Sequence, residues 1–224
     1  MINMNVLVFR IKGPYAHFRR VYTTTSASSY SFPTRTAILG MIGAILGIER
    51  KARAEHLKYL KDLNVAVTLE KPVQKVRFPL NYQSIKESKR IQVPLEVIKN
   101  SSYLIFVEEF ELYEKLKTYL KNKETVFTPY LGISEFIASL EYIGEYELKE
   151  ASLPCKVSSV LPSSKVKIKP EKGVLYLRER ATRSMDERRN YIEHETYILR
   201  KDAKPIIVTK GEVFSVGRWN ITWL

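Results

Sequence analysis

Apolar and polar positions alternate with a period of two in four segments of the first 150 residues, as expected for strands. These segments are residues 5–12, 64–69, 102–108 and 137–148. Two further segments have helical spacing: residues 34–48, with a bent continuation toward Leu60, and residues 111–121. Thr34 or Thr36 can cap the first of these helices. The predicted element order is therefore β-α-β-β-α-β.

Two parts of the chain lie outside that pattern. Residues 71–100 alternate along two arms around a basic tip, which predicts a protruding β-hairpin. The tail contains short strand candidates at residues 157–161, 174–177, 206–208 and 220–223. We therefore predict an α+β protein in two domains. Residues 1–150 form a ferredoxin-like domain, the layout of RNA recognition motifs, with the hairpin inserted at about 71–100, and residues 151–224 form a small β-rich domain.

The balance of charge points to a polyanionic partner. The 224 residues include 37 Lys and Arg against 24 Asp and Glu, a formal net charge of +13. Each phosphate that a protein neutralises releases counterions and adds affinity that does not depend on sequence. The first acidic residue is Glu49, so every Lys, Arg, Asp or Glu before it is basic. The alternative is a basic surface that serves only solubility.

Cations, tyrosines and hydroxyls are concentrated near the amino terminus, and together they suit RNA. Cations pair with phosphates, tyrosines stack on unpaired bases, and hydroxyls bind phosphate oxygens. The amino-terminal candidates are Lys12, Tyr15, His17, Arg19, Arg20, Tyr22, Ser29, Tyr30 and Arg35. Further candidates on the hairpin and the tail are Lys75, Arg77, Lys89, Arg90, Arg178 and Arg180. Arg178 and Arg180 alternate with Leu177 and Glu179, so both should project from one face of a strand.

Glycine is unusually frequent in the first predicted helix. Each interior glycine costs about 1 kcal/mol relative to alanine. Gly40, Gly43 with Ala44, and Gly47 would form a ridge of small residues on one face. Such a ridge permits close packing on the sheet, or the close approach of another backbone or a nucleic acid.

Signals for catalysis and metal binding are weak. The single cysteine, Cys155, and the widely spaced histidines have no zinc-like spacing, and we expect no metal and no cofactor. His17 lies near Lys12 and Tyr15, so acid–base cleavage of RNA is one interpretation, and stacking or hydrogen bonding is the other. The longest apolar run, residues 37–48, is too short to span a bilayer, and we expect a cytoplasmic protein without a membrane partner.

Several segments carry a family resemblance. They read FRIKGPYAHFR at residues 9–19, SYSFPTRT at 29–36, LGMIGAILGI at 39–48, PYLGISE at 129–135 and VSSVLP at 157–162. The first three resemble the amino-terminal signature of the "Cas five" proteins of the repeat-associated RNA-binding superfamily. The last two are similar to later segments of the same family. The similarity covers nearly the whole chain and is most specific at the amino terminus.

This resemblance implies a role in CRISPR antiviral defence. Such proteins cap the backbone filament of a type I effector complex, called Cascade, and hold the 5′ handle of the crRNA. The implied partners are this RNA, the Cascade backbone subunits, the large subunit and target DNA within the complex. The hairpin corresponds to the family's thumb, which packs on the adjacent backbone subunit. The subtype that the tail most resembles is I-B or I-A.

One branch of the family, in type I-C, cleaves precursor crRNA with a Tyr, Lys and His set whose histidine follows a lysine in mid-chain. Here no histidine lies between His56 and His194. The expectation is therefore a non-catalytic RNA-binding subunit. The alternative is a metal-independent endoribonuclease that processes precursor crRNA, with His17 as acid or base.

Overall fold

The computed structural model describes residues 4–21, 27–48, 59–83, 90–186, 188 and 190–224. Most of the secondary structure in these ranges is strand, and the helices whose bounds lie within them are α1 (Arg35–Leu46) and α3 (Tyr113–Asn122). The molecule is therefore richer in strands than the sequence pattern predicts. The additional strands lie mainly in the carboxy-terminal third.

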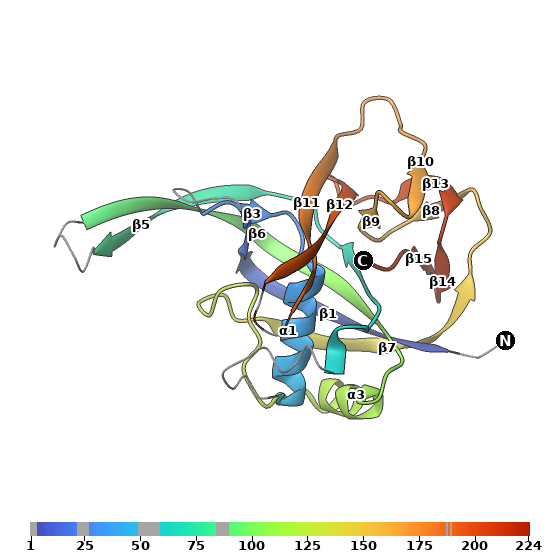
Figure 1. Ribbon diagram of the computed structural model, residues 1–224, viewed down its shortest axis with the longest axis horizontal. Coiled ribbons are helices and arrows are strands. Elements are labelled where there is room, and N and C mark those ends of the chain that lie inside the picture. Colours follow the sequence, from blue (N-terminus) through green and yellow to red (C-terminus); the bar gives the residue numbers. More distant parts are fainter. Residues whose placement is uncertain (1–3, 22–26, 49–58, 84–89, 187, 189) are drawn as a thin grey trace.

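The centre of the molecule is an antiparallel sheet with the order β7-β1-β6-β4. Its strands are β1 (Asn5–Ala16), β4 (Val65–Leu69), β6 (Arg90–Glu108) and β7 (Ser139–Glu150). Helix α1 joins β1 to the strand β4, and α3 joins β6 to β7 (Figure 1). Strands β1 and β6 are longer than predicted, because their pairing runs from Val6–Glu108 to Ala16–Ile98.

Both faces of the central sheet are covered, and the alternation of side chains along β1 shows how. Leu7 and Phe9 point into the main core beneath α1 and α3, where Ile42 is also buried. Val6 and Val8 point to the other face and join a second core with Trp219. Since successive side chains of a strand point to opposite faces, a strand covered on both faces is apolar at almost every position.

The predicted hairpin is present. Strand β5 (Lys75–Gln83) pairs with β6 in an unbroken antiparallel register from Lys75–Ile98 to Gln83–Arg90. Figure 1 shows the two strands projecting away from the body of the molecule, and we call them the thumb. Residues 84–89 at its tip, which include the candidate Lys89, lie outside the described residues.

The carboxy-terminal third forms two small sheets, with orders β10-β13-β8 and β11-β12-β9, and then returns to the central sheet. The strands are β8 (Cys155–Val157), β9 (Leu161–Pro162), β10 (Val166–Ile168), β11 (Tyr176–Met185), β12 (Tyr191–Arg200) and β13 (Ile206–Gly211). Strand β14 (Phe214–Val216) pairs with both β7 and β15 (Trp219–Ile221). Their side chains cover the second face of the sheet, where the rings of Phe106 and Trp219 lie 5.6 Å apart.

Residues on both sides of the boundary expected at residue 150 share one buried cluster. Ala181, Tyr197 and Leu224 are buried in the same cluster as Leu7 and Phe9. The backbone connects the two parts as well, because the N–H of Leu224 donates to Val65 O at 2.9 Å. The division into two domains stays a prediction, and the two parts share buried surface.

Helix α1 corrects the predicted ridge of glycines. The helix ends at Leu46, and Gly47 is its left-handed C-cap with φ +75°. The N–H of Gly47 donates to Ala44 O, and the N–H of Ile48 donates to Gly43 O. A Cβ built on Gly40 would meet no described atom within 4 Å. Gly47 is therefore explained by the helix end, and no described residue packs closely on Gly40. The expected continuation over residues 49–58 lies outside the described residues.

Candidate nucleic-acid interface

The amino-terminal candidate residues lie where the thumb joins the body. Two short strands pair here, β2 (Phe18–Arg19) and β3 (Ser29–Tyr30). Ala27 extends this pair onto the edge of the thumb, since its N–H donates to Pro94 O and its carbonyl accepts from Glu96 N–H at 2.9 Å. Residue Ala27, just before β3, is thus held against β6.

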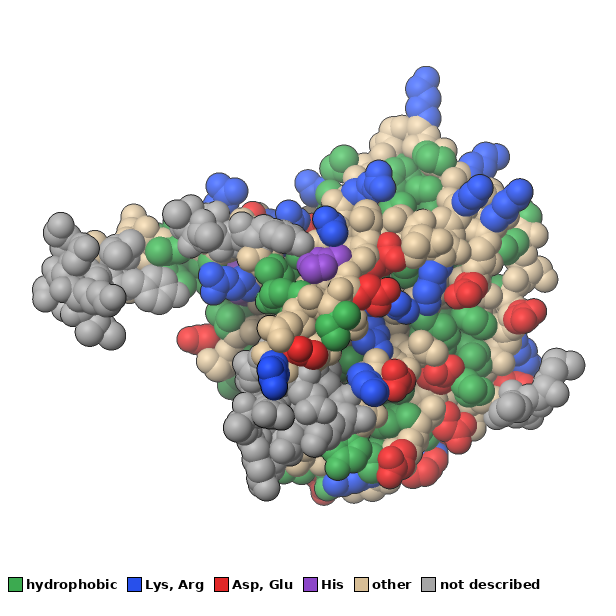
Figure 2. Space-filling model, viewed as in Figure 1, with side chains coloured by type: hydrophobic (Ala, Val, Ile, Leu, Met, Phe, Trp, Pro, Cys, Tyr) green, Lys and Arg blue, Asp and Glu red, His purple; other side chains and the backbone are tan. Residues whose placement is uncertain are grey.

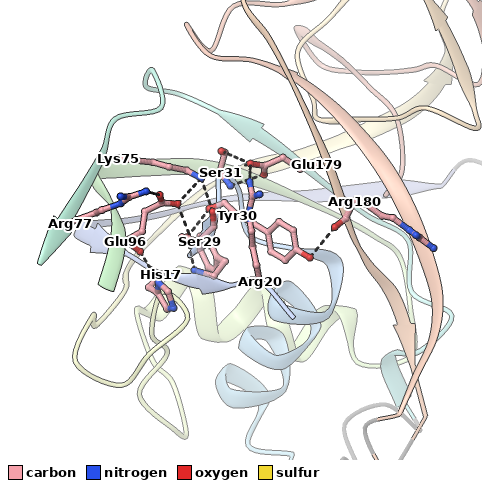
Figure 3. Close-up of polar contacts among 11 residues, drawn as sticks. His17, Arg20, Ser29, Tyr30, Ser31, Lys75, Arg77, Glu96, Glu179 and Arg180 are labelled. Carbon is pink, nitrogen blue, oxygen red and sulfur yellow. Dashed lines mark hydrogen bonds and ion pairs between the residues drawn. The ribbon is translucent and has the colours of Figure 1, made fainter. Parts of the chain in front are cut away.

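A buried carboxylate, that of Glu179 on β11, organises the centre of this region (Figure 3). It accepts hydrogen bonds from the N–H and the hydroxyl of Ser31 at 2.8 and 2.9 Å. The guanidinium of Arg20 donates to it, and the ammonium of Lys75 lies 3.8 Å away. A buried charge needs such partners, because desolvation is costly without them. Glu179 therefore joins β11 to β2, β3 and the thumb.

A second carboxylate, that of Glu96 on β6, lies beside the first (Figure 3). Lys75 donates to it at 3.1 Å, and the N–H of Ser29 donates at 3.2 Å. Burial alone would raise the pKa of Glu96, but the contacts with Lys75 outweigh it, so the pKa lies below its usual range. Arg77 lies 3.8 Å away and its side chain is 73% exposed. Arg20 and Lys75 are thus engaged by internal carboxylates, whereas Arg77 keeps most of its surface in solvent.

His17 is buried beneath this network, with 2% of its surface exposed. Its Nδ1 lies 2.7 Å from Glu96 O, which can only accept, so we assign the proton to Nδ1. Burial lowers the pKa of His17, although the hydrogen bond to Glu96 opposes the shift. In this arrangement the His17 side chain is almost fully shielded from solvent. The RNA contact expected for His17 is therefore corrected to a structural role.

Arg35, expected to contact a phosphate, serves inside the protein instead. It is 7% exposed at the start of α1. Its Nη2 donates to Lys61 O and Leu63 O at 2.5 and 2.9 Å, and its Nη1 to Arg183 O at 3.3 Å. Burial, and then the charge of Arg183, lower its pKa. Arg35 donates to carbonyl groups before β4 and on β11. It therefore has a structural role and not the expected contact with a phosphate.

Ser29 and Tyr30 are buried on β3 and are corrected in the same way. The Tyr30 ring packs 6.5 Å from that of Phe32, and its hydroxyl donates to Arg180 O at 2.9 Å. The Ser29 hydroxyl donates to Tyr30 O and accepts from Phe18 N–H. A side chain that is 3% exposed offers no face to a base, so Tyr30 is a structural residue here.

Lys12 and Tyr15 lie on β1, at the base of the thumb. The ammonium of Lys12 is exposed and lies 3.5 Å from Glu141. Tyr15 is half-buried, with its ring 5.2 Å from Phe78 and 5.8 Å from Phe136. Tyr15 thus supports the thumb and keeps part of its surface in solvent.

Four further predicted cations point into solvent. The candidate Tyr22 lies outside the described residues. Arg19 is exposed on β2, Arg90 on the thumb, and Arg178 and Arg180 on β11. The strand β11 alternates as predicted, because Glu179 and Ala181 face inward between and beyond the two arginines. Figure 3 shows Arg77 and Arg180 at opposite ends of the polar network. Exposed cations from β2, β5 and β11 thus surround a rigid internal framework.

Sequence reasoning missed the two glutamates that build this framework. Glu179 was noted only for its place between Arg178 and Arg180, and Glu96 was not singled out. Alternation along β6 places Glu96 on the face opposite the buried Leu95 and Val97, so the local pattern gave no signal that Glu96 is engaged internally. Their cationic partners come from other strands, which the alternation along one strand does not reveal.

Other kinds of site find no support in the described part of the chain. There, no group of three or more His, Cys, Asp and Glu side chains is placed to hold a metal ion. Neither described helix has the length and the apolar character needed to cross a membrane. The exposed cations above are thus the feature of this region with a clear binding chemistry.

The fold is similar to the folds of solved CRISPR proteins. A CRISPR protein from Archaeoglobus fulgidus aligns with TM-score 0.62 at 12% identity, covering 97% of this chain and 98% of that one. A chain titled "CRISPR RNA-guided surveillance complex" aligns with TM-score 0.57 at 11% identity, covering 91% of each chain. A chain of a type III-B Cmr-beta complex, bound to cognate target RNA and AMPPnP, aligns with TM-score 0.50 at 12% identity, covering 91% and 86%. At such identities the likeness concerns the fold alone.

The sequence identifies the family. Residues 6–200 match the family described as CRISPR-associated protein (Cas_Cas5). The match covers most of the chain, so the protein belongs to this family. The comparison with curated proteins gives no match. The family inferred from the sequence motifs is confirmed, and the subtype stays a prediction.

Proposed function

We propose that this protein is a non-catalytic subunit of a type I CRISPR effector complex, or Cascade, and that it holds the 5′ handle of the crRNA. Membership of the family supports a role in an effector complex. The likeness to a chain of an RNA-guided surveillance complex supports it further. We also propose a cytoplasmic location, which suits a guide RNA as partner.

The exposed arginines around the polar network are the observation that carries this proposal. Arg178 and Arg180 project from the outer face of β11, while Glu179 between them anchors the strand internally. Arg19 and Arg77 extend the cationic surface onto β2 and the thumb. Cations held on rigid strands can match a fixed RNA backbone without a large loss of side-chain and loop freedom on binding.

The remaining elements fit a subunit with several neighbours. We propose that the thumb contacts the adjacent backbone subunit, because two paired strands that leave the body can reach another chain. The large subunit and target DNA are further proposed partners. We also propose that β1, α1, β4, β6, α3 and β7 form a ferredoxin-like unit, and the strand order β7-β1-β6-β4 supports this.

The absence of turnover is part of the proposal. A general acid or base must come within hydrogen-bond reach of the proton it moves. The burial of His17 and its hydrogen bond to Glu96 O support a structural role for the residue proposed as an alternative catalyst.

The test uses the purified chain in EDTA with a repeat-containing RNA and a scrambled RNA, over several salt concentrations. Binding and cleavage are followed together. We expect salt-dependent binding that prefers the repeat RNA, with the RNA left intact. In the double variant Arg178→Gln/Arg180→Gln, affinity for the repeat RNA should fall by ~10-fold or more at low salt, and the salt slope by about 2.

The matched control is Lys61→Gln/Lys123→Gln, which removes the same charge from exposed lysines near β4 and α3. It should bind the repeat RNA as the wild type does. Equal losses in both variants would reduce the effect to net charge and refute an interface on β11. A defined cut in the repeat, abolished by His17→Ala, would instead make the protein a processing nuclease.

A further inference from the structure

The carboxy-terminal third carries more positive charge than the proposed interface uses. Residues 151–224 contain 15 Lys and Arg against 8 Asp and Glu, more than half of the net charge of +13. Several of these acids are engaged elsewhere: Glu171 and Asp202 bind Arg200, and Glu193 binds Arg183. Figure 2 shows Lys and Arg side chains gathered over this part of the molecule.

The lysines share one face of the small β10-β13-β8 sheet. Its inner face is apolar and buried, with Val157, Val166, Ile206 and Val208 in one cluster. Each strand also carries an exposed lysine: Lys156 on β8, Lys167 on β10 and Lys210 on β13. A fourth exposed lysine, Lys169, directly follows β10. Lys156 stands opposite Ile207, and Lys169 N–H donates to Ile207 O at 2.8 Å, so both lysines flank the same residue of the middle strand.

An irregularity in the pairing places Lys210 on this face. Val208 is buried, so regular alternation would turn Lys210 inward as well. The register shifts between Lys167–Lys210 and Ile168–Val208, which leaves Thr209 as an extra residue and Lys210 exposed. Bulges of this kind redirect a side chain and are over-represented near functional sites.

The residue after the bulge maintains this geometry. Gly211 has φ +122°, and a Cβ there would lie 2.1 Å from Lys165 O. Glycine is therefore required where the strand leaves the bulge. The backbone is thus specifically adapted to bring Lys210 beside Lys167.

The resulting pair of like charges needs a counter-ion. Lys167 and Lys210 are direct cross-strand neighbours, and like charges in that position are destabilising. Among the residues that the structure describes, no acidic side chain forms an ion pair with any of the four lysines. A bound polyanion would remove the repulsion.

The chemistry of this face favours phosphates of a nucleic acid over an acidic protein surface. Lysine is depleted in protein–protein interfaces, whose centres are apolar, and here the apolar member of the face is the partly buried Ile207. The face has neither the aromatic rings nor the amide side chains that read bases. We propose that the outer face of the β10-β13-β8 sheet, which we call the lysine face, binds a nucleic-acid backbone regardless of its sequence. This surface is separate from the proposed handle interface.

The test compares Lys167→Gln/Lys210→Gln with the control pair Lys61→Gln/Lys123→Gln in the full chain. The probes are a duplex DNA of arbitrary sequence, a single-stranded DNA and a single-stranded RNA without the repeat, each labelled for fluorescence anisotropy over a salt series. The lysine-face variant should bind its preferred probe more weakly at low salt, with the salt slope reduced by about 2. The probe with the largest loss identifies the kind of nucleic acid that this face takes.

A thermal melt of the free protein at low salt shows whether the variant is folded. Its Tm should be no lower than that of the wild type, because the substitution removes a repulsion. Unchanged affinity and slope for all three probes would overturn the proposal, as would an equal loss in the control variant. A loss confined to one base sequence would overturn the sequence-independent binding.

The two proposed surfaces fail independently in this design. The lysine-face variant should keep the preference for repeat over scrambled RNA, whereas Arg178→Gln/Arg180→Gln should reduce it. If the arginine pair has no effect and the lysine pair does, the handle interface is refuted and the lysine face stands.

Discussion

At the scale of single residues, two glutamates decide which of the basic side chains are available. Glu179 engages Arg20 and Glu96 engages Lys75, so these cations stabilise the fold. Arg178 lies beside Glu179 in sequence and points the other way. The face of the strand that a charged residue occupies therefore decides whether its side chain faces solvent or supports the framework.

Gly132 is the residue whose substitution should most directly damage this region. Its φ is +97°, and a Cβ would lie 1.8 Å from His17 O. We expect Gly132→Ala to lower the free energy of unfolding by more than the roughly 1–3 kcal/mol of dihedral strain alone. Urea denaturation followed by circular dichroism measures the change.

Gly173→Ala is the matched control, because Gly173 has φ +78° and no described atom within 4 Å of a Cβ. It should therefore report the dihedral strain without the clash. Equal losses in the two variants would contradict the close contact between Gly132 and the backbone of His17.

His17 should make stability depend on pH. Burial lowers its pKa in the folded protein below the ordinary 6.5, so the unfolded chain takes up a proton first as the pH falls. The contribution of neutral His17 to the free energy of unfolding is therefore present above about pH 6.5. It is lost as the pH falls below that value, by at most about 1.4 kcal/mol per pH unit.

The measurement compares the free energy of unfolding of the wild type and His17→Asn between about pH 7.5 and 5.5. The wild type should lose more stability over this window. Parallel losses would show that His17 takes up its proton equally in both states. Glu96, whose pKa is also lowered, acts at lower pH, where carboxylates protonate.

At the scale of elements, Arg35 fixes the start of α1 to two other parts of the chain. Its guanidinium donates to carbonyls just before β4 and on β11. The three contacts connect segments that are 26 to 148 residues apart in sequence. The helix is therefore positioned by a buried side chain as well as by its apolar residues.

Substitution of Arg35 separates this role from the one expected from sequence. In Arg35→Met the carbonyls lose their donors, and the free energy of unfolding should fall by roughly 1–3 kcal/mol. RNA affinity, measured where the variant is folded, should stay at the wild-type value. Unchanged stability with weaker and less salt-dependent RNA binding would restore the phosphate contact.

At the scale of the whole molecule, the carboxy-terminal third completes the core. Trp219 covers the second face of the central sheet beside Phe106, while Tyr197 and Leu224 are buried with the residues beneath α1. The part of the chain predicted as a separate domain thus covers apolar surface of the other part. Loss of either part would expose that surface to water.

This shared core predicts one cooperative unfolding transition. Both tryptophans of the chain, Trp219 and Trp223, are buried in the carboxy-terminal third, so their fluorescence reports on that part. Circular dichroism reports on all strands and helices. The two signals should change with the same urea midpoint. A separate, earlier fluorescence transition would instead support independent domains divided near residue 150.

The elements of the amino-terminal part were predictable because each has a strong period of its own. The strands β1 and β4, helix α3 and the thumb all follow from alternation or from helical spacing within one segment. The strands of the carboxy-terminal third were harder, because β8 and β10 are short and β12 carries polar residues along an exposed face. Short strands in small sheets depend on their neighbours more than on their own pattern.

The candidate site was predictable in its composition and only partly in its contacts. The expectation that Arg178 and Arg180 project from one face of a strand is confirmed, since alternation along one strand decides that. It misplaced Arg35, Tyr30 and His17, which have the right chemistry for RNA but are buried. The partners that bury them come from distant segments of the chain.

The sequence by itself therefore determined the family, several of the strands and helices in the first 150 residues, the thumb and the excess of positive charge. These are properties of local pattern and composition. Only the tertiary structure decided which cations face solvent, which carboxylates neutralise the others, and how the last third closes the core. Those outcomes depend on contacts between residues far apart in the chain, such as Arg20 with Glu179, and on a single-residue shift in register that exposes Lys210.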